Sequence, residues 1–174
     1  MKIWFLPRSC PWQEFFMFRY VLLILTLMLA AVVRLSAQSE VEKVIVKYED
    51  TDGARYFIAQ GPKMILARRL LKSTQVAPVA QDVDELYILK MQSASQSAQE
   101  KFARDLSVAL KSYEYYGKEP SKNGEVDVYI MRHAPGSSQI DELVIYNPTI
   151  YSLNSLIGHF TASQLLKLEN PSGR

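Results

Sequence analysis

The sequence predicts an α+β protein with a single folded domain and one mixed sheet of about five strands, covered by helices chiefly on one face. Its 174 residues are 48% hydrophobic and 22% charged, a composition typical of globular proteins. Apolar residues recur at helical and strand spacing in the order α-β-α-β-α-β-β-β-α. This order combines crossover units with an antiparallel meander, which is the pattern of the α+β class.

The N-terminal 37 residues have the pattern of a secretory signal peptide. Residues 20–33 read YVLLILTLMLAAVV, follow Arg19 and precede the small residues Ser36 and Ala37. This run is shorter than the roughly 20 apolar residues that a membrane-spanning helix needs. We therefore expect cleavage after Ala37 and release of the domain into the periplasm or the extracellular space. An uncleaved segment would instead anchor the protein in the membrane.

This interpretation divides the chain into a signal peptide (1–37), an exported domain (38–169) and a frayed tail (170–174). The stretch 1–16 is unusual for a signal peptide, and Met17 followed by the apolar run is sufficient, so Met17 is the expected translation start. Cys10 is the only cysteine and precedes the apolar run. The exported part therefore has no disulfide, no thiolate nucleophile, no thiolate metal site and no acylated lipoprotein cysteine.

The first half of the domain contains two helix patterns and two strand patterns. Apolar residues at i, i+3, i+4 and i+7 predict a helix over 41–48, and the run RYFIA predicts a strand over 55–59. Pro62 suits the first turn of a helix over 63–72. After a loop through Pro78, the alternation in ELYILKMQ predicts a strand over 85–92.

The second half of the domain begins with a helix and continues as strands. The Ser97-x-x-Glu100 spacing predicts a capping box, and apolar residues at helical spacing extend the helix to 113, before Gly117 and Pro120. Strands over 125–132 and 142–146 form a predicted hairpin, with a fifth strand over 150–157. A second capping box, Thr161-x-x-Gln164, starts a last helix that runs to 168.

Charge excludes one function class. The first 37 residues hold four basic residues and one acidic residue, which leaves 16 basic and 17 acidic residues in the exported part. A nearly neutral domain lacks the dense basic face that holds a nucleic-acid backbone, so no nucleic-acid partner is expected. The basic residues at 68, 69 and 72 and the acidic residues at 82, 84 and 85 indicate solvated faces, and we assign no site to them.

Catalytic and metal-binding patterns are weak. His133, Ser137 or Ser138, and Asp141 are the nearest set with hydrolase chemistry, but they surround a predicted turn and no G-x-S-x-G elbow is present. His133 and His159 have no metal-ligand spacing. The sequence therefore predicts no catalytic residues and no metal.

Nucleotide and calcium sites also lack their patterns. No G-x-G-x-x-G or P-loop is present, so no nucleotide cofactor is expected. An EF-hand loop placed on Gly53 would put Tyr48 and Ala59 at its first and twelfth ligand positions, where carboxylates are needed.

Tyrosines give the sharpest binding hypothesis. Strand alternation places Tyr129 and Met131 with Tyr146 on one sheet face, and Tyr87 can join them. If no helix covers this face, it is a candidate interface, because tyrosine offers a large apolar area and a hydroxyl group. The alternative is that the first or last helix covers it.

The chain resembles a family of small exported Bacteroides-type proteins that contain a domain of unknown function. The resemblance rests on the SAQ signal end, the amphipathic start of the domain, the strand at Arg55 and the closing run DELVIYNPTIYSLNSLIGHFTASQLLKL. It implies export and an α+β fold and supplies no catalytic residue.

These observations favour an exported cell-envelope protein that binds another protein or an envelope component without chemistry of its own. One alternative is a small envelope hydrolase whose site is assembled only in the fold. The other is a membrane-anchored structural protein, which requires an uncleaved signal segment. Contact with the membrane is otherwise not expected.

Overall fold

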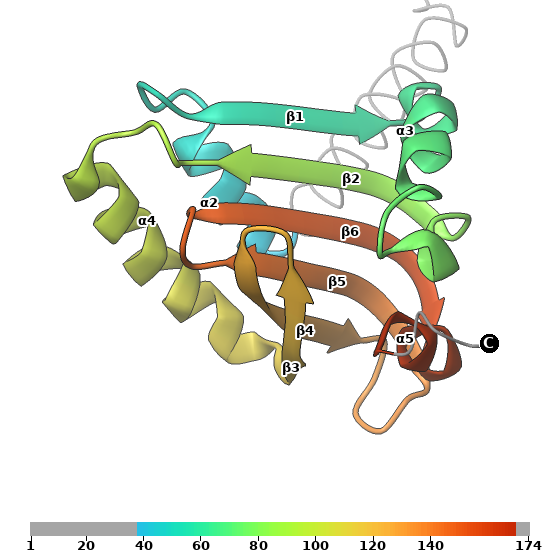
Figure 1. Cartoon of the computed structure of the whole chain (residues 1–174). Helices are drawn as coiled ribbons and strands as arrows, with labels where there is room; N and C mark the ends of the chain where they lie inside the picture. The colour runs from blue at the N-terminus through green and yellow to red at the C-terminus, as the bar shows by residue number, and fades with distance from the viewer. Residues whose placement is uncertain (1–37, 170–174) are drawn as a thin grey trace, which may run out of the picture. The chain divides into compact units, whose positions relative to one another are not determined.

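The computed structural model describes residues 38–169, and contacts group the described residues from Ser39 onward into one compact unit. Its centre is a six-stranded antiparallel sheet with the strand order β1-β2-β6-β5-β4-β3, so each strand runs opposite to its neighbours (Figure 1). The strands are β1 (Arg55–Gln60), β2 (Val83–Lys90), β3 (Glu114–Ser121), β4 (Gly124–Arg132), β5 (Gln139–Asn147) and β6 (Ser152–Thr161).

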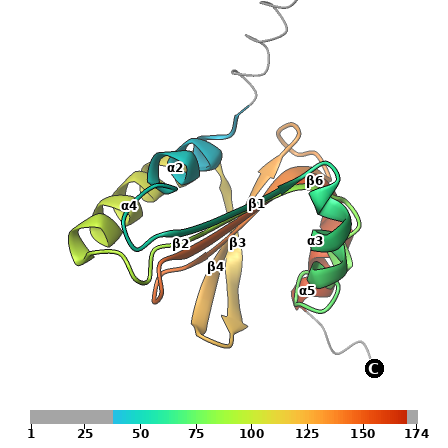
Figure 2. The same cartoon turned by 90° about the horizontal axis from the view of Figure 1, so that it is seen from above.

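Helices lie on both faces of the sheet. Figure 2 shows α2 (Glu40–Tyr48) and α4 (Gln96–Ala109) together on one face, and α3 (Lys63–Leu71) and α5 (Ala162–Glu169) together on the other. Two short 3₁₀ turns, η1 (Ala77–Val79) and η2 (Leu110–Ser112), extend these layers. No helix within residues 38–169 is long and apolar enough to cross a membrane.

Strand alternation creates two separate hydrophobic cores. The core on the α2 and α4 side contains Ile45, Leu89, Phe102, Leu106 and Leu153, all at most 1% exposed. Successive residues of the same strands point to the other face, where a second core packs against α3, η1 and α5. That second core includes Val83, Ile130, Ile140, Leu143, Leu156, Phe160 and Leu165.

The structure confirms the α+β class and a single sheet, but it corrects three details. The sheet is antiparallel rather than mixed, and helices cover both faces rather than chiefly one. The sixth strand is β3, a segment in which Gly117 and Pro120 predict a stop. As the edge strand, β3 accommodates a bulge between Tyr115 and Gly117 and a proline that cannot donate a ladder hydrogen bond.

Helix caps explain a further difference. The N-cap of α4 is Ser95, two residues before the predicted Ser97, and its hydroxyl accepts a hydrogen bond from the Ala98 backbone N–H at 3.3 Å. At α5 the predicted glutamine contact is present, because the Thr161 N–H donates to Gln164 Oε1 at 2.8 Å. The predicted signal peptide and the tail at 170–174 lie outside the described residues.

Candidate binding groove

The tyrosine face predicted as an open interface is covered by the protein's own helices. Tyr87 is 2% exposed and Tyr146 is 9% exposed, and both belong to the core beneath α2 and α4. Tyr129 and Met131 are partly buried and pack against the same core. The prediction of an uncovered face is therefore wrong: two amphipathic helices bury it, as the alternative to that prediction allowed.

Part of this face forms a buried polar network around Glu142 of β5. The Glu142 carboxylate accepts hydrogen bonds from Tyr113 Oη at 2.6 Å, Ser155 Oγ at 2.7 Å and Ser39 Oγ at 3.2 Å. Ser39 also caps α2, because its Oγ accepts from the Glu42 backbone N–H at 3.0 Å. The network therefore fastens the start of α2 to the sheet.

Electrostatics at this network follow from burial. Desolvation raises the pKa of the Glu142 carboxyl above its ordinary value, the three hydroxyl donors lower it in part, and the charge of Glu42 raises it further. Burial likewise raises the pKa of Tyr113, and the negative charge of Glu142 raises it further. Because these hydroxyl groups already surround Glu142, we interpret the network as structural.

The two histidines are exposed, and each lies near one carboxylate: His133 near Asp141 and His159 near Asp84. His133 Nδ1 lies 3.1 Å from Asp141 Oδ2, but the imidazole side chain is 64% exposed. The Ser137 Oγ accepts a hydrogen bond from the Gln139 backbone N–H at 3.0 Å, as expected for a turn serine. Within residues 38–169, no three histidine, cysteine, aspartate or glutamate side chains gather closely enough to hold a metal ion.

A groove lies on the opposite face of the sheet, beside the layer formed by α3, η1 and α5. Its volume is about 330 Å³, at the small end of ligand sites. The floor comes from four strands and is aliphatic: Leu86 and Ile88 of β2, Leu156 of β6, Ile145 of β5 and Val126 of β4. Val126 and Ile145 also line a smaller adjoining hollow of about 50 Å³.

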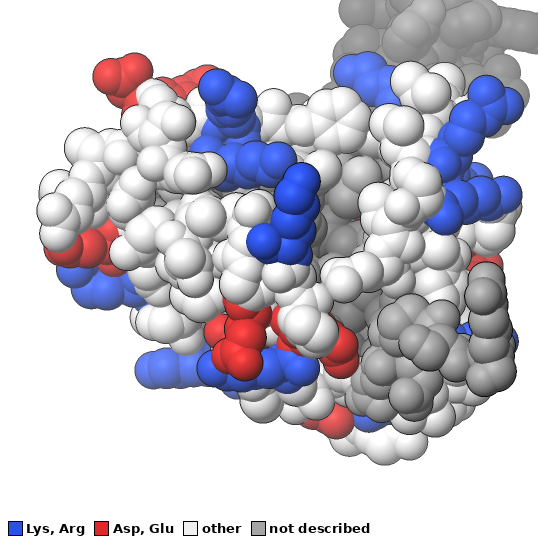
Figure 3. Space-filling view, viewed as in Figure 1, with Lys and Arg blue, Asp and Glu red and all other residues white. Residues whose placement is uncertain are grey.

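Two walls enclose this floor. One wall is the segment after α3, with Leu71 and Val76, and the other is the β3–β4 turn. Gln75 Nε2 donates to the Pro120 carbonyl oxygen at 3.0 Å, which connects the two walls. Asn147 Nδ2 donates to the Asn123 carbonyl oxygen at 3.2 Å, and this bond holds the β3–β4 turn against β5. The space-filling view in Figure 3 is hollowed between this turn and the α3 layer.

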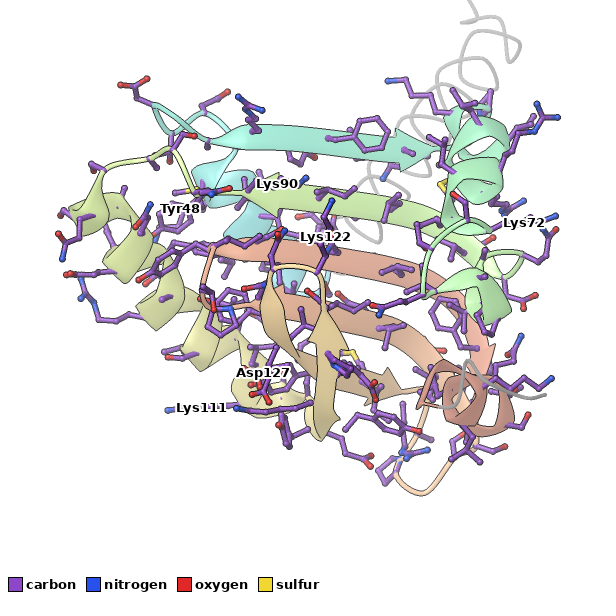
Figure 4. All side chains as sticks on the ribbon, viewed as in Figure 1. Tyr48, Lys72, Lys90, Lys111, Lys122 and Asp127 are labelled. Carbon is purple, nitrogen blue, oxygen red and sulfur yellow. The ribbon has the colours of Figure 1, made fainter. Side chains whose placement is uncertain are left out.

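The mouth of the groove is basic. Lys90, at the end of β2, lines the groove and is exposed, and it lies directly across the strand pair from Arg55. Figure 4 shows Lys90 and Lys122 of the β3–β4 turn on the same face of the molecule. Among the described residues, none of these three cations has a side-chain hydrogen bond or ion pair. Asn154 of β6, beside Lys90 in the lining, also has no side-chain partner within 38–169.

Sequence reasoning missed this groove because its parts are distant along the chain. Lys90 and Asn154 become neighbours only through the β2–β6 pairing, in which Ile88 faces Asn154. The sequence RYFIA carried one local signal of the groove. Phe57 lies on the same face of the strand as Arg55, and its side chain is 49% exposed in the structure. That strand therefore presents apolar and basic side chains on a face that no helix fully covers.

Comparison of the chain with protein-family models, with curated proteins and with solved structures found no match.

Proposed function

We propose that this chain is an exported, non-catalytic binding protein of the cell envelope that holds an amphipathic anion. The apolar part of the ligand occupies the groove over β2, β6, β5 and β4, and its anionic group meets Arg55, Lys90 and Lys122. The observation that carries this proposal is the basic mouth of an aliphatic groove. There Arg55 and Lys90 lie opposite each other on neighbouring strands, and neither has an acidic partner within residues 38–169.

The floor of the groove favours an apolar ligand. Ile88 and Ile145 are only partly buried although both belong to the central strands of the sheet. Each methylene group that a ligand removes from water there contributes about 0.8 kcal/mol. An aliphatic chain is therefore a suitable occupant, and the side-chain amide of Asn154 can hydrogen-bond a polar group of the ligand.

The basic pair favours an anion at the mouth. Like charges directly opposite each other on antiparallel strands destabilise a sheet by a few tenths of a kcal/mol up to about 1 kcal/mol. Arg55, at the start of β1, and Lys90, at the end of β2, face each other in this way. Local arrangements that cost stability are concentrated at functional sites, and a bound carboxylate or phosphate would relieve this repulsion.

Two other observations support the remaining parts of the proposal. Export is inferred from the apolar run at 20–33 with its small-residue end, and the resemblance to exported proteins agrees with it. Binding without chemistry is favoured because the side chains that line the groove include neither a histidine nor a carboxylate.

Calorimetric titration of the full chain with dodecanoate tests the proposal. Dodecyltrimethylammonium has the same alkyl chain with the opposite charge and serves as the ligand control. We expect dodecanoate to bind at least ten times more tightly than the cation. Lys90→Gln should weaken dodecanoate binding by about tenfold, the effect of one charge-assisted hydrogen bond. Lys101→Gln, which neutralises an exposed lysine of α4 on the other face, should leave binding unchanged.

A floor variant separates the apolar contribution from the charge. Ile145→Gln places an amide at the point shared by the groove and the adjoining hollow, and should weaken binding of both detergents. Equal affinity for the two detergents, or dodecanoate binding unaffected by both Lys90→Gln and Ile145→Gln, would contradict the proposal.

A further inference from the structure

The outward face of α3 exposes more aliphatic surface than the fold uses. Ile65 is 75% exposed, Leu66 is 63% exposed and Leu70 is 60% exposed. The inward face is formed by Met64 and Ala67, which are 2% and 3% exposed and belong to the core. The packing of α3 on the sheet is therefore complete without the three outward residues.

The same helix is strongly basic. Lys63, Arg68, Arg69 and the C-cap residue Lys72 are its charged residues, and it contains no acidic residue. Arg68 is engaged, because its Nε donates to the Val83 carbonyl oxygen at 2.8 Å and its Nη2 lies 3.3 Å from Asp84 Oδ1.

The other three cations, Lys63, Arg69 and Lys72, have no side-chain partner among residues 38–169. Figure 3 shows Lys and Arg side chains gathered over the α3 region, and Figure 4 shows Lys72 pointing away from the sheet.

The aliphatic and basic residues are interleaved on one side of the helix. At 3.6 residues per turn, Arg69 and Lys72 lie on the same half of the helix as Ile65, Leu66 and Leu70, opposite the buried Met64. Long basic side chains extend along apolar neighbours and place their charges at the level of a polar surface. Helices that lie in a membrane interface also combine exposed aliphatic side chains with lysine and arginine.

We propose that α3 docks this domain onto an anionic lipid surface. The aliphatic side chains enter the boundary between headgroups and acyl chains, and Lys63, Arg69 and Lys72 meet the anionic headgroups. An acidic protein is the less suitable occupant, because protein interfaces rely on aromatic side chains and directed hydrogen bonds, and the sequence KMILARRLLK contains no aromatic or uncharged polar residue. This docking is independent of the ligand in the groove.

Lysine footprinting of the full chain tests the docking residue by residue. The protein is treated with an amine-reactive ester alone, with phosphatidylcholine vesicles, or with vesicles that also contain phosphatidylglycerol, and modification is read by mass spectrometry. We expect modification of Lys63 and Lys72 to slow severalfold only with the anionic vesicles. Lys101 and Lys111, on α4 and η2 of the other face, should react at an unchanged rate and serve as internal controls. Because modification is measured separately at each lysine, attachment of the N-terminal segment to the vesicles would not by itself produce selective protection of Lys63 and Lys72.

Two matched variants test the two kinds of contact. Leu66→Glu should abolish the protection, whereas Val108→Glu on α4 should preserve it, and both original side chains are 63% exposed. Arg69→Gln should weaken binding to anionic vesicles by roughly fivefold, the contribution of one basic residue at such a surface.

Three results would overturn the proposal. One is an unchanged modification rate at Lys63 and Lys72 with anionic vesicles. Another is equal protection at Lys101 and Lys111. A third is concentration-dependent protection of Lys63 and Lys72 without lipid, which would identify a second copy of the chain as the occupant.

Discussion

Replacing Tyr113 by phenylalanine tests the buried network that fastens α2 to the sheet. The variant keeps the ring, which is 8% exposed, and removes the shortest of the hydrogen bonds to Glu142. Hydrogen bonds to charged groups contribute about 1.5–3 kcal/mol. Because Ser155 and Ser39 still donate to the carboxylate, we expect the lower half of this range. Urea unfolding at neutral pH should therefore show a loss of about 2 kcal/mol in the free energy of unfolding.

The loss should depend on pH. Burial raises the folded-state pKa of Glu142 above its ordinary value of 4.5, so the native state binds more protons than the unfolded state between these two values. The contribution of Glu142 to stability is then largest below pH 4.5 and declines as pH rises through the folded-state pKa. Removal of the Tyr113 donor raises this pKa further. The effect of Tyr113→Phe should therefore be larger at neutral pH than below pH 4.5.

Tyr129→Phe is the matched control. Tyr129 is a partly buried tyrosine against the same core, and its hydroxyl has no hydrogen bond within residues 38–169, so its removal should cost less than about 0.5 kcal/mol. A loss below about 0.5 kcal/mol for Tyr113→Phe, or an equal loss for both variants, would refute the assigned role of the network.

Three further predictions concern the same fold. Gly158→Ala should destabilise the protein by several kcal/mol in urea unfolding, because a Cβ there would clash with the Asp82 backbone; a native-like variant would contradict this close approach. Ser39→Ala should cost at least about 1 kcal/mol, because it removes both the α2 cap and the hydrogen bond to Glu142, and an unchanged midpoint would argue against both contacts. Burial raises the pKa values of Tyr48 and Tyr146 to about 12, so the free energy of unfolding should fall between pH 10 and pH 12, and part of the tyrosinate absorbance should appear only with unfolding; complete ionisation of the tyrosines near pH 10 in the folded protein would contradict this.

The elements that follow local rules could be predicted from the sequence. The apolar spacing around 41–48 and the run RYFIA predict α2 and β1 closely, because their burial pattern repeats along the element. The edge strand β3 could not be predicted in this way. Gly117 and Pro120 weaken a strand pattern, and only pairing with β4 stabilises the strand.

The candidate site illustrates a second limit. Alternation correctly places Tyr87, Tyr129 and Tyr146 on one face, but it does not say which helix covers that face. The groove required the strand order, because β2 meets β6 only in the folded sheet. The exposed aliphatic face of α3 likewise became visible only when the structure showed which side of that basic helix is buried.

Methyl-resolved NMR of the full chain with dodecanoate tests the proposed function most directly. We expect the largest shift changes at Ile88 and Ile145, which line the floor of the groove, and we expect Lys90→Gln to reduce them. Methyl groups beneath α2 and α4, such as those of Ile45 and Leu106, should remain unchanged. Shift changes confined to that second set, or none at Ile88 and Ile145, would contradict the assignment of the groove as a binding site.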